Sequence, residues 1–281
     1  MLPLEDTYID ILRKAMRGGG YTEETLAAAS GLDAVHLREL RAGTLRDEQS
    51  LRRLCPVLNL DAAALLDISR QHWTPLPRQG FCDSFAMYTT PYKDFFVNAY
   101  LLWDPATRKA AAFDTGTDCD GMLADIAKHG LELESLFLTH SHTDHIMEID
   151  RLMHKTGCRR ALIGAREPVE GVEASVREGD RFSVGGLRIR ALDTFGHTVG
   201  GVTYVVEGLK ADGTLVALVG DSLFSGSMGG GLVSHQDALR NNLEKIMTLP
   251  DTTILCSGHG PLTSVAEEKR HNPFFAGKFP V

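Results

Sequence analysis

The stretch Thr139-His140-Ser141-His142-Thr143-Asp144-His145 concentrates three imidazoles and one carboxylate within six consecutive residues. In a chain of this composition, such a string arises by chance about once in a thousand chains. Burying four ligand-type side chains without a common partner costs several kcal/mol, and a divalent cation is the usual partner. The stretch therefore predicts a metal site.

The residues on either side of this stretch predict its place in the fold. Residues 133–138 form a short apolar run suited to a buried strand, and residues 145–155 carry apolar side chains at helical spacing. The ligand-type residues then lie in a loop between a strand end and a helix start, where open α/β structures place their chemistry. The helix dipole there favours the carboxylate of Asp144 and keeps the imidazole of His145 neutral, the state that binds metal.

Three later segments share one layout, in which a strand-like run ends in a ligand-type residue beside a glycine. They are Phe195-Gly196-His197, Val219-Gly220-Asp221 and Gly258-His259-Gly260. Glycine beside the ligand lets the backbone turn sharply and approach the site closely. Each segment alone is ordinary turn chemistry, but together with the cluster at residues 140–145 the set is specific for a metal centre.

The chain after residue 80 alternates predicted strands and helices. Strands are expected at 81–89, 98–103, 110–114, 133–138, 161–163, 181–184, 187–192, 202–206, 215–219 and 253–256, and helices at 120–129, 145–155 and 236–247. Strand-rich halves, each followed by helices, indicate two sheets sandwiched between helices, an α+β fold.

From about residue 81 to 281, this order of motifs resembles the metallo-β-lactamase fold superfamily. The resemblance implies an αββα sandwich with a two-metal site at its edge. It assigns three ligands to each metal and one bridging carboxylate: His140, His142 and His197, then Asp144, His145 and His259, and finally Asp221. Asp114 matches a position that supports the site and is not a ligand. This ligand set favours zinc as the pair of divalent ions, with iron or manganese as alternatives.

The tail from Gly258 to Phe275 is similar to short glyoxalase II-like hydrolases, which lack a separate C-terminal domain that holds glutathione. The segment Gly226-Ser227-Met228-Gly229-Gly230-Gly231 departs from that family, in which Gly-Arg-Thr-Asp is common at this place. We therefore expect a flexible glycine-rich loop beside Asp221 that shapes a different pocket.

The ligand inventory implies a hydrolase, because two divalent ions lower the pKa of water to about 7. Their charge exceeds that of Asp144, Asp221 and one hydroxide, which favours a small anionic substrate. A thiolate leaves without much acid assistance, so an acyl thioester suits this site, and Asp144 is the expected catalytic residue because it can orient the nucleophile. The alternative enzyme is a persulfide dioxygenase that holds one iron through His140, His197 and Asp221.

The first 73 residues predict an all-α domain, followed by the metallohydrolase domain at residues 74–281. Helices are expected at 6–16, 22–31, 33–43, 47–58 and 61–68. Residues 22–43 resemble the helix-turn-helix of phage-repressor-like DNA-binding domains, and His36, Arg38 and Arg41 are the candidates to face a major groove.

The charge of this helical region argues against DNA binding. Residues 1–73 hold nine Lys and Arg against eleven Asp and Glu, whereas a phosphate-binding module should be basic. We therefore favour packing, protein contact or formation of a homo-oligomer for this region. A DNA-binding regulator with a metal-site sensor domain is the alternative of a different class.

Composition bounds the remaining function classes. The net charge of −8 argues against a general nucleic-acid or anionic-membrane surface. Five widely spaced cysteines indicate reduced, mostly buried thiols. Without a signal-like start or a long apolar run, we expect a cytoplasmic protein with no membrane segment. Two further histidines, His235 and His271, are expected to lie in loops and not to bind metal.

Overall fold

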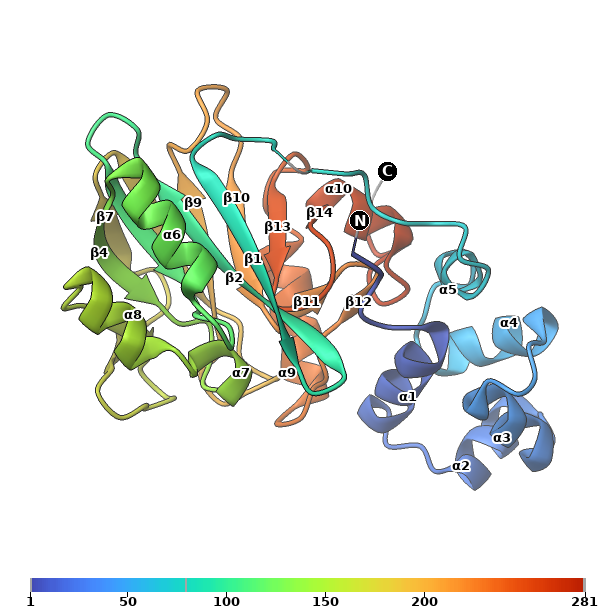
Figure 1. Ribbon diagram of the computed structural model, residues 1–281. Coiled ribbons are helices and arrows are strands. Elements are labelled where there is room, and N and C mark those ends of the chain that lie inside the picture. The colour runs from blue at the N-terminus through green and yellow to red at the C-terminus, as the bar shows by residue number, and fades with distance from the viewer. Residues whose placement is uncertain (1, 79, 280–281) are drawn as a thin grey trace.

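Five short helices open the chain and lie together at one end of the molecule (Figure 1). The computed structural model describes residues 2–78 and 80–279. The helices are α1 (Tyr8–Gly18), α2 (Glu23–Ser30), α3 (Ala34–Ala42), α4 (Glu48–Val57) and α5 (Ala62–Ser69). The side chains of Thr22, Asp33, Asp47 and Asp61 cap the last four by accepting first-turn N–H groups. All five predicted helices are therefore present, while the helix-turn-helix assignment stays a prediction.

The rest of the chain forms two six-stranded sheets and one small hairpin. The first sheet has the order β1 (Phe85–Tyr92), β2 (Phe95–Trp103), β3 (Lys109–Phe113), β4 (Glu132–Phe137), β5 (Ala161–Gly164) and β6 (Glu173–Val176). The second has the order β14 (Thr263–Ser264), β13 (Ile254–Ser257), β10 (Val216–Gly220), β9 (Val202–Glu207), β8 (Leu187–Asp193) and β7 (Arg181–Val184). The hairpin consists of β11 (Leu223–Phe224) and β12 (Ser227–Met228).

The sheets face each other, and helices cover both outer faces (Figure 1). On β3, Ala111 and Phe113 pack into the cluster between the sheets, whereas Ala110 and Ala112 pack against the outer helices. Those helices are α6 (Asp120–His129) and α8 (Ile149–Thr156) on the first sheet, with α9 (His235–Asn241), the π-helical turn η1 (Asn242–Ile246) and α10 (Val265–His271) on the second. The alternation of strand side chains thus builds the expected αββα sandwich, and the α+β class is confirmed. None of the described helices has the length and apolar character needed to span a bilayer.

The N-terminal helices share one hydrophobic cluster with the outer face of the second sheet. The backbone N–H of Asp61 at the start of α5 donates to the carbonyl of Pro273 in the C-terminal tail, 2.8 Å away. Lys14 of α1 donates to the carbonyl of Met228 in β12, 2.9 Å away. The helices are therefore packed onto the sandwich, and the division at residues 73 and 74 stays a prediction.

Two histidines differ from their expected surroundings, because both lie in helices and not in loops. His235 begins α9, and an added Cβ on Gly18 of α1 would overlap its ring. His271 ends α10 and stacks on Trp73 with 5.0 Å between ring centroids. Each ring is thus a packing element between the helical region and the sandwich.

The glycine-rich segment also differs from the expected flexible loop, since residues 225–229 are buried. The buried carboxylate of Glu268 accepts the N–H of Gly226 at 3.1 Å and the amide of Asn272 at 2.7 Å. Asn272 in turn donates to the carbonyl of Ser227 at 2.8 Å. These contacts from α10 hold the hairpin in place.

Candidate metal centre

Seven ligand-type side chains converge at one edge of the sandwich. Strands β8 and β10 are both antiparallel to β9, and β13 is parallel to β10, so the carboxyl ends of these three strands share that edge. The loop after β4 and the short helix α7 (Thr143–Ile146) approach it from the first sheet. They deliver His140, His142, Asp144 and His145, while the ends of β8, β10 and β13 deliver His197, Asp221 and His259.

The seven side chains form two groups in which all ligand atoms lie within 4.8 Å of one another: His140, His142, His197 and Asp221, and then Asp144, His145 and His259. Asp221 lies between the groups. Its Oδ2 atom is 3.4 Å from His197 Nε2 and 3.3 Å from His259 Nε2. Its Oδ1 atom is 3.4 Å from His145 Nε2. The carboxylate of Asp221 is therefore placed to be shared by both groups.

These spacings fit divalent cations. Two ligands bound tetrahedrally at about 2.1 Å from one ion lie about 3.4 Å apart. The distance from His142 Nδ1 to His197 Nε2 is 3.1 Å, and that from His259 Nε2 to Asp144 Oδ2 is 3.5 Å. Of the buried side-chain atoms that have no hydrogen-bond partner among the described residues, three belong to this cluster: His140 Nε2, His145 Nε2 and Asp221 Oδ1. Because orphaned buried polar atoms are costly, the donor set matches a metal pair.

The surroundings also select the histidine tautomers. Four rings donate from Nδ1 to a neighbouring oxygen, which leaves Nε2 free to bind a metal. The acceptors are the Gly230 carbonyl for His197 (2.8 Å), the Phe96 carbonyl for His259 (2.6 Å), Asp114 for His145 (2.9 Å) and the Thr139 hydroxyl for His140 (3.0 Å). These contacts are the usual outer support of metal-binding imidazoles.

The charge balance of the cluster centres on Asp221. Burial acts to raise its pKa, but the imidazoles of His259 and His145 outweigh burial and hold the pKa well below its usual range. Burial lowers the pKa of His140 well below its usual range, and the neighbouring His145 adds to this effect. A buried carboxylate that stays ionised beside a neutral imidazole is a suitable environment for a cation.

Asp114, expected to support the site, lies behind two of the ligands. Its Oδ1 atom accepts the N–H of Thr139 at 2.7 Å, and Oδ2 accepts the Thr139 hydroxyl at 2.8 Å and the ring of His145. Since Thr139 also accepts from His140, one carboxylate orients His145 directly and His140 through a hydroxyl. Asp114 is not in either group of candidate ligands.

Glu167 is a site residue that the sequence patterns did not reveal. Its buried carboxylate accepts the N–H and hydroxyl of Ser141 at 2.8 and 2.7 Å. It also accepts the Thr198 hydroxyl at 2.6 Å and the Gly200 N–H at 2.9 Å. Ser141 separates two candidate ligands and Thr198 follows a third, so Glu167 ties the two ligand loops together. Its position after β5, parallel to β4, is the signal that could have indicated this role.

Gly258 illustrates why glycine accompanies a ligand here. A Cβ at this position would overlap Asp221 Oδ1 and approach the Cε1 atom of His145 to 2.7 Å. The backbone before His259 therefore runs against two other candidate ligands, and only glycine leaves room for them.

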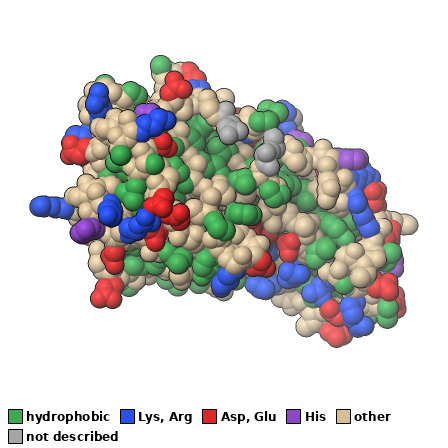
Figure 2. Space-filling view, in the orientation of Figure 1, with side chains coloured by type: hydrophobic (Ala, Val, Ile, Leu, Met, Phe, Trp, Pro, Cys, Tyr) green, Lys and Arg blue, Asp and Glu red, His purple; other side chains and the backbone are tan. Residues whose placement is uncertain are grey.

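The basic residues considered for DNA contact are engaged within the helical region. His36 Nε2 lies 3.2 Å from Asp47, Arg38 lies 3.5 Å from Glu23, and Arg41 pairs with the same glutamate. On the face shown in Figure 2, acidic and basic side chains alternate over this region without a continuous basic surface. The three side chains expected to face a major groove are therefore paired with acidic residues of the same region.

Comparison with known proteins agrees with this geometry. Residues 92–259 match the Metallo-beta-lactamase superfamily, and the chain belongs to that family. An uncharacterised protein of Mycobacterium tuberculosis (strain ATCC 25618 / H37Rv) is 30% identical over 211 residues, 64% of this chain and 93% of the relative. The hydroxyacylglutathione hydrolase of Methylobacterium nodulans is 35% identical over 167 residues, 59% of this chain and 63% of the relative. The crystal structure of ETHE1 from Myxococcus xanthus superposes with a TM-score of 0.59 at 30% identity, covering 68% of this chain and 85% of the other.

Proposed function

We propose that this protein is a binuclear metallohydrolase that cleaves an acyl thioester. The observation that carries the proposal is the carboxylate of Asp221, whose Oδ2 atom lies 3.4 Å from His197 of one ligand group and 3.3 Å from His259 of the other. A shared carboxylate is what a two-metal site needs. The likeness to a hydroxyacylglutathione hydrolase supports a thioester as the substrate, although this chain spans 63% of that relative.

The chemistry follows from the donor set. The seven candidate ligands would hold two divalent ions, proposed to be zinc, which would polarise a carbonyl group and lower the pKa of bound water to about 7. Asp144 Oδ1 makes no hydrogen bond within the described residues, so it can accept one from the attacking water and fix its orientation. Because a thiol has a pKa of about 8.5, the leaving thiolate departs without a protonating side chain.

The buried residues around the ligands keep this geometry fixed. Asp114 holds His145 and Thr139, while Glu167 ties the loop of Ser141 to the loop of Thr198. Ligands held by such contacts need little rearrangement during the reaction, which is the condition for efficient catalysis.

The test begins with zinc, iron and manganese content per chain of protein purified without a metal-binding tag. We expect two metals per chain and hydrolysis of a panel of acyl thioesters. Asp144→Asn should lower kcat about 10²- to 10⁴-fold, whereas Asp150→Asn, on the exposed side of α8, should not. One iron per chain, unaffected by the Asp144 change and without thioesterase activity, would instead favour a mononuclear persulfide dioxygenase.

A further inference from the structure

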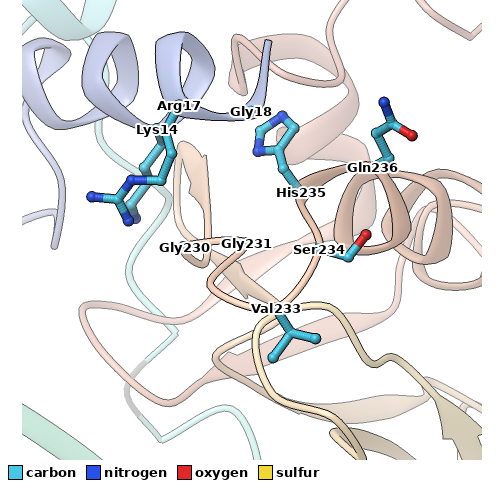
Figure 3. A pocket seen from close by; sticks show the side chains of 9 residues that line it. All are labelled: Lys14, Arg17, Gly18, Gly230, Gly231, Val233, Ser234, His235 and Gln236. Atoms are coloured by element: carbon cyan, nitrogen blue, oxygen red, sulfur yellow. The ribbon is translucent and has the colours of Figure 1, made fainter. Parts of the chain in front are cut away.

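A cavity lies between α1 and the glycine-rich segment, next to the loop of His197. Its volume is about 260 Å³, and its lining includes Lys14, Arg17, Gly230, Gly231 and His235. Figure 3 shows the side chains of Lys14 and Arg17 extending from α1 on the side of Gly230 and Gly231, with the His235 ring beneath Gly18. The N-terminal helices thus form one wall and the metallohydrolase fold forms the other.

The lining carries positive charge with no acidic side chain among its residues. Lys14 pairs with Asp6 and donates to Met228, so its ammonium is already engaged. Arg17 is exposed and makes no ion pair or hydrogen bond through its side chain within residues 2–78 and 80–279. The guanidinium of Arg17 is therefore the charge that remains for a ligand.

The opposite wall of the cavity includes Gly230 and Gly231, which have no side chains and present backbone N–H groups. The N–H groups of Gly230 and Gly231 donate to no acceptor in the described part of the chain. A Cβ on Gly231 would overlap the backbone of His235, so this position excludes a side chain. Unpaired backbone N–H groups and a guanidinium lining one cavity are the usual components of an anion site.

The cavity wall is joined directly to a candidate metal ligand. The carbonyl of Gly230 accepts the Nδ1 proton of His197 at 2.8 Å. The N–H groups of Val233 and Ser234 donate to the carbonyl of Gly196, at 3.1 and 3.0 Å. One short segment, residues 230–234, therefore borders the cavity and braces the loop of His197, so the cavity lies next to that loop.

We propose that this cavity binds the anionic end of the substrate, a phosphate or a carboxylate carried by the thiol portion of the thioester, with Arg17 as the recognising residue. The identity of the substrate in this proposal rests on the proposed thioester hydrolase function. The binding of an anion rests on the cavity alone. In this proposal the N-terminal helices take part in substrate selection. They supply the charged side chain that the glycine-rich segment, residues 226–231, does not carry.

The test compares Arg17→Glu and Arg17→Lys with Arg13→Glu as the matched control. Arg13 lies on the same helix, pairs with Asp10 and does not line the cavity. Lys14 is not changed, because its contacts with Asp6 and Met228 hold the hairpin. Thermal melts of each variant establish that it is folded.

Binding is measured first with non-hydrolysable S-alkyl thioethers of coenzyme A and of glutathione, on the metal-loaded wild-type protein and variants. We expect Arg17→Glu to weaken binding about 10- to 100-fold, as for loss of a charged hydrogen bond, and Arg17→Lys to retain part of it. Arg13→Glu should bind as the wild type does. Selective binding of the coenzyme A thioether assigns phosphate as the anion, and selective binding of the glutathione thioether assigns carboxylate.

Kinetics then separate this site from the reaction itself. In Arg17→Glu, KM for an anionic thioester should rise at least tenfold more than KM for a neutral N-acetylcysteamine thioester. Wild-type protein that binds the thioethers through Arg17 but hydrolyses no thioester would refute the proposed function and leave the anion site standing. Absence of binding by either thioether, or equal effects of Arg17→Glu and Arg13→Glu, would overturn the anion site.

Discussion

Replacing Glu167 tests whether the geometry of the metal centre depends on a residue that contacts no metal. In Glu167→Ala, the N–H groups of Ser141 and Gly200 lose their acceptor inside the protein. An unsatisfied buried donor costs about 1–3 kcal/mol, so the two N–H groups together predict a loss of about 2–6 kcal/mol in the free energy of unfolding, with the half-buried Ser141 contributing the smaller part. Loss of outer support typically weakens metal binding about 10- to 100-fold.

The substitution Glu167→Gln gives an intermediate result, because one oxygen is kept and the other becomes an NH₂ group. The amide nitrogen can donate to the Thr198 hydroxyl but not to the Gly200 N–H, so one hydrogen bond is lost. We expect a cost of about 1–3 kcal/mol and a smaller loss of metal affinity than in the alanine variant.

The assay combines denaturant unfolding with metal affinity measured against a competing chelator. Glu173→Ala is the matched control, since the side chain of this exposed glutamate of β6 accepts from the hydroxyl of Ser175 and from no other group in the described part of the chain. If Glu167→Ala binds metal as tightly as the wild type and loses less than about 1 kcal/mol, the linkage of the two ligand loops through Glu167 is refuted.

Three further predictions concern the tail, the ligand loops and the helical region. Burial raises the pKa of Glu268 to about 8 from 4.5, so the folded state keeps a proton that the unfolded state releases. Stability should therefore fall as pH rises from about 4.5 to 8, and the fall should be smaller in Glu268→Gln, as measured by denaturation midpoints across that range. Gly258→Ala should displace Asp221 and lower the metal content below two per chain, measured by elemental analysis. A gel shift with genomic DNA at low salt should show no specific complex, because Arg38 and Arg41 pair with Glu23; a salt-sensitive specific complex would restore the regulator hypothesis.

The longer elements of the fold could be predicted because periodicity and capping residues mark them. Asp33 and Asp61 are capping residues that mark the starts of α3 and α5. The strand predicted at residues 133–138 is β4, observed one residue earlier at Glu132–Phe137. Strands β11, β12 and β14 have two residues each, too few for any alternation to be visible. They exist because tertiary contacts such as those of Glu268 align them.

Helix α10 was missed for a related reason. Its residues Glu267 to His271 are all charged or ionisable, which is typical of an exposed segment. In the structure, Glu268 is fully buried, and the amide of Asn272 and the backbone of Gly226 satisfy its carboxylate. A buried acid whose partners come from another segment leaves no local signal in the sequence.

The candidate ligands could be predicted because four of them are consecutive or nearly so, and the other three follow glycine at a strand end. The residues that surround and support these ligands could not be predicted from the sequence. Glu167 acts through Ser141 and Thr198, which lie 26 and 31 positions away, and no spacing rule connects them. The cavity beside Gly230 needs α1, which the sequence assigns to a different domain.

The hairpin β11–β12 explains how such distant segments converge on one site. Lys14 holds it from α1 through the carbonyl of Met228, and Glu268 holds it from α10 through the N–H of Gly226. On the remaining side, a Cβ on Gly229, the residue after β12, would overlap the carbonyl of Asp221, so the chain at the end of the hairpin packs directly against this candidate ligand. Because the hairpin lies between the N-terminal helices, the C-terminal tail and Asp221, we expect a change in either terminal region to affect the candidate metal centre through these contacts.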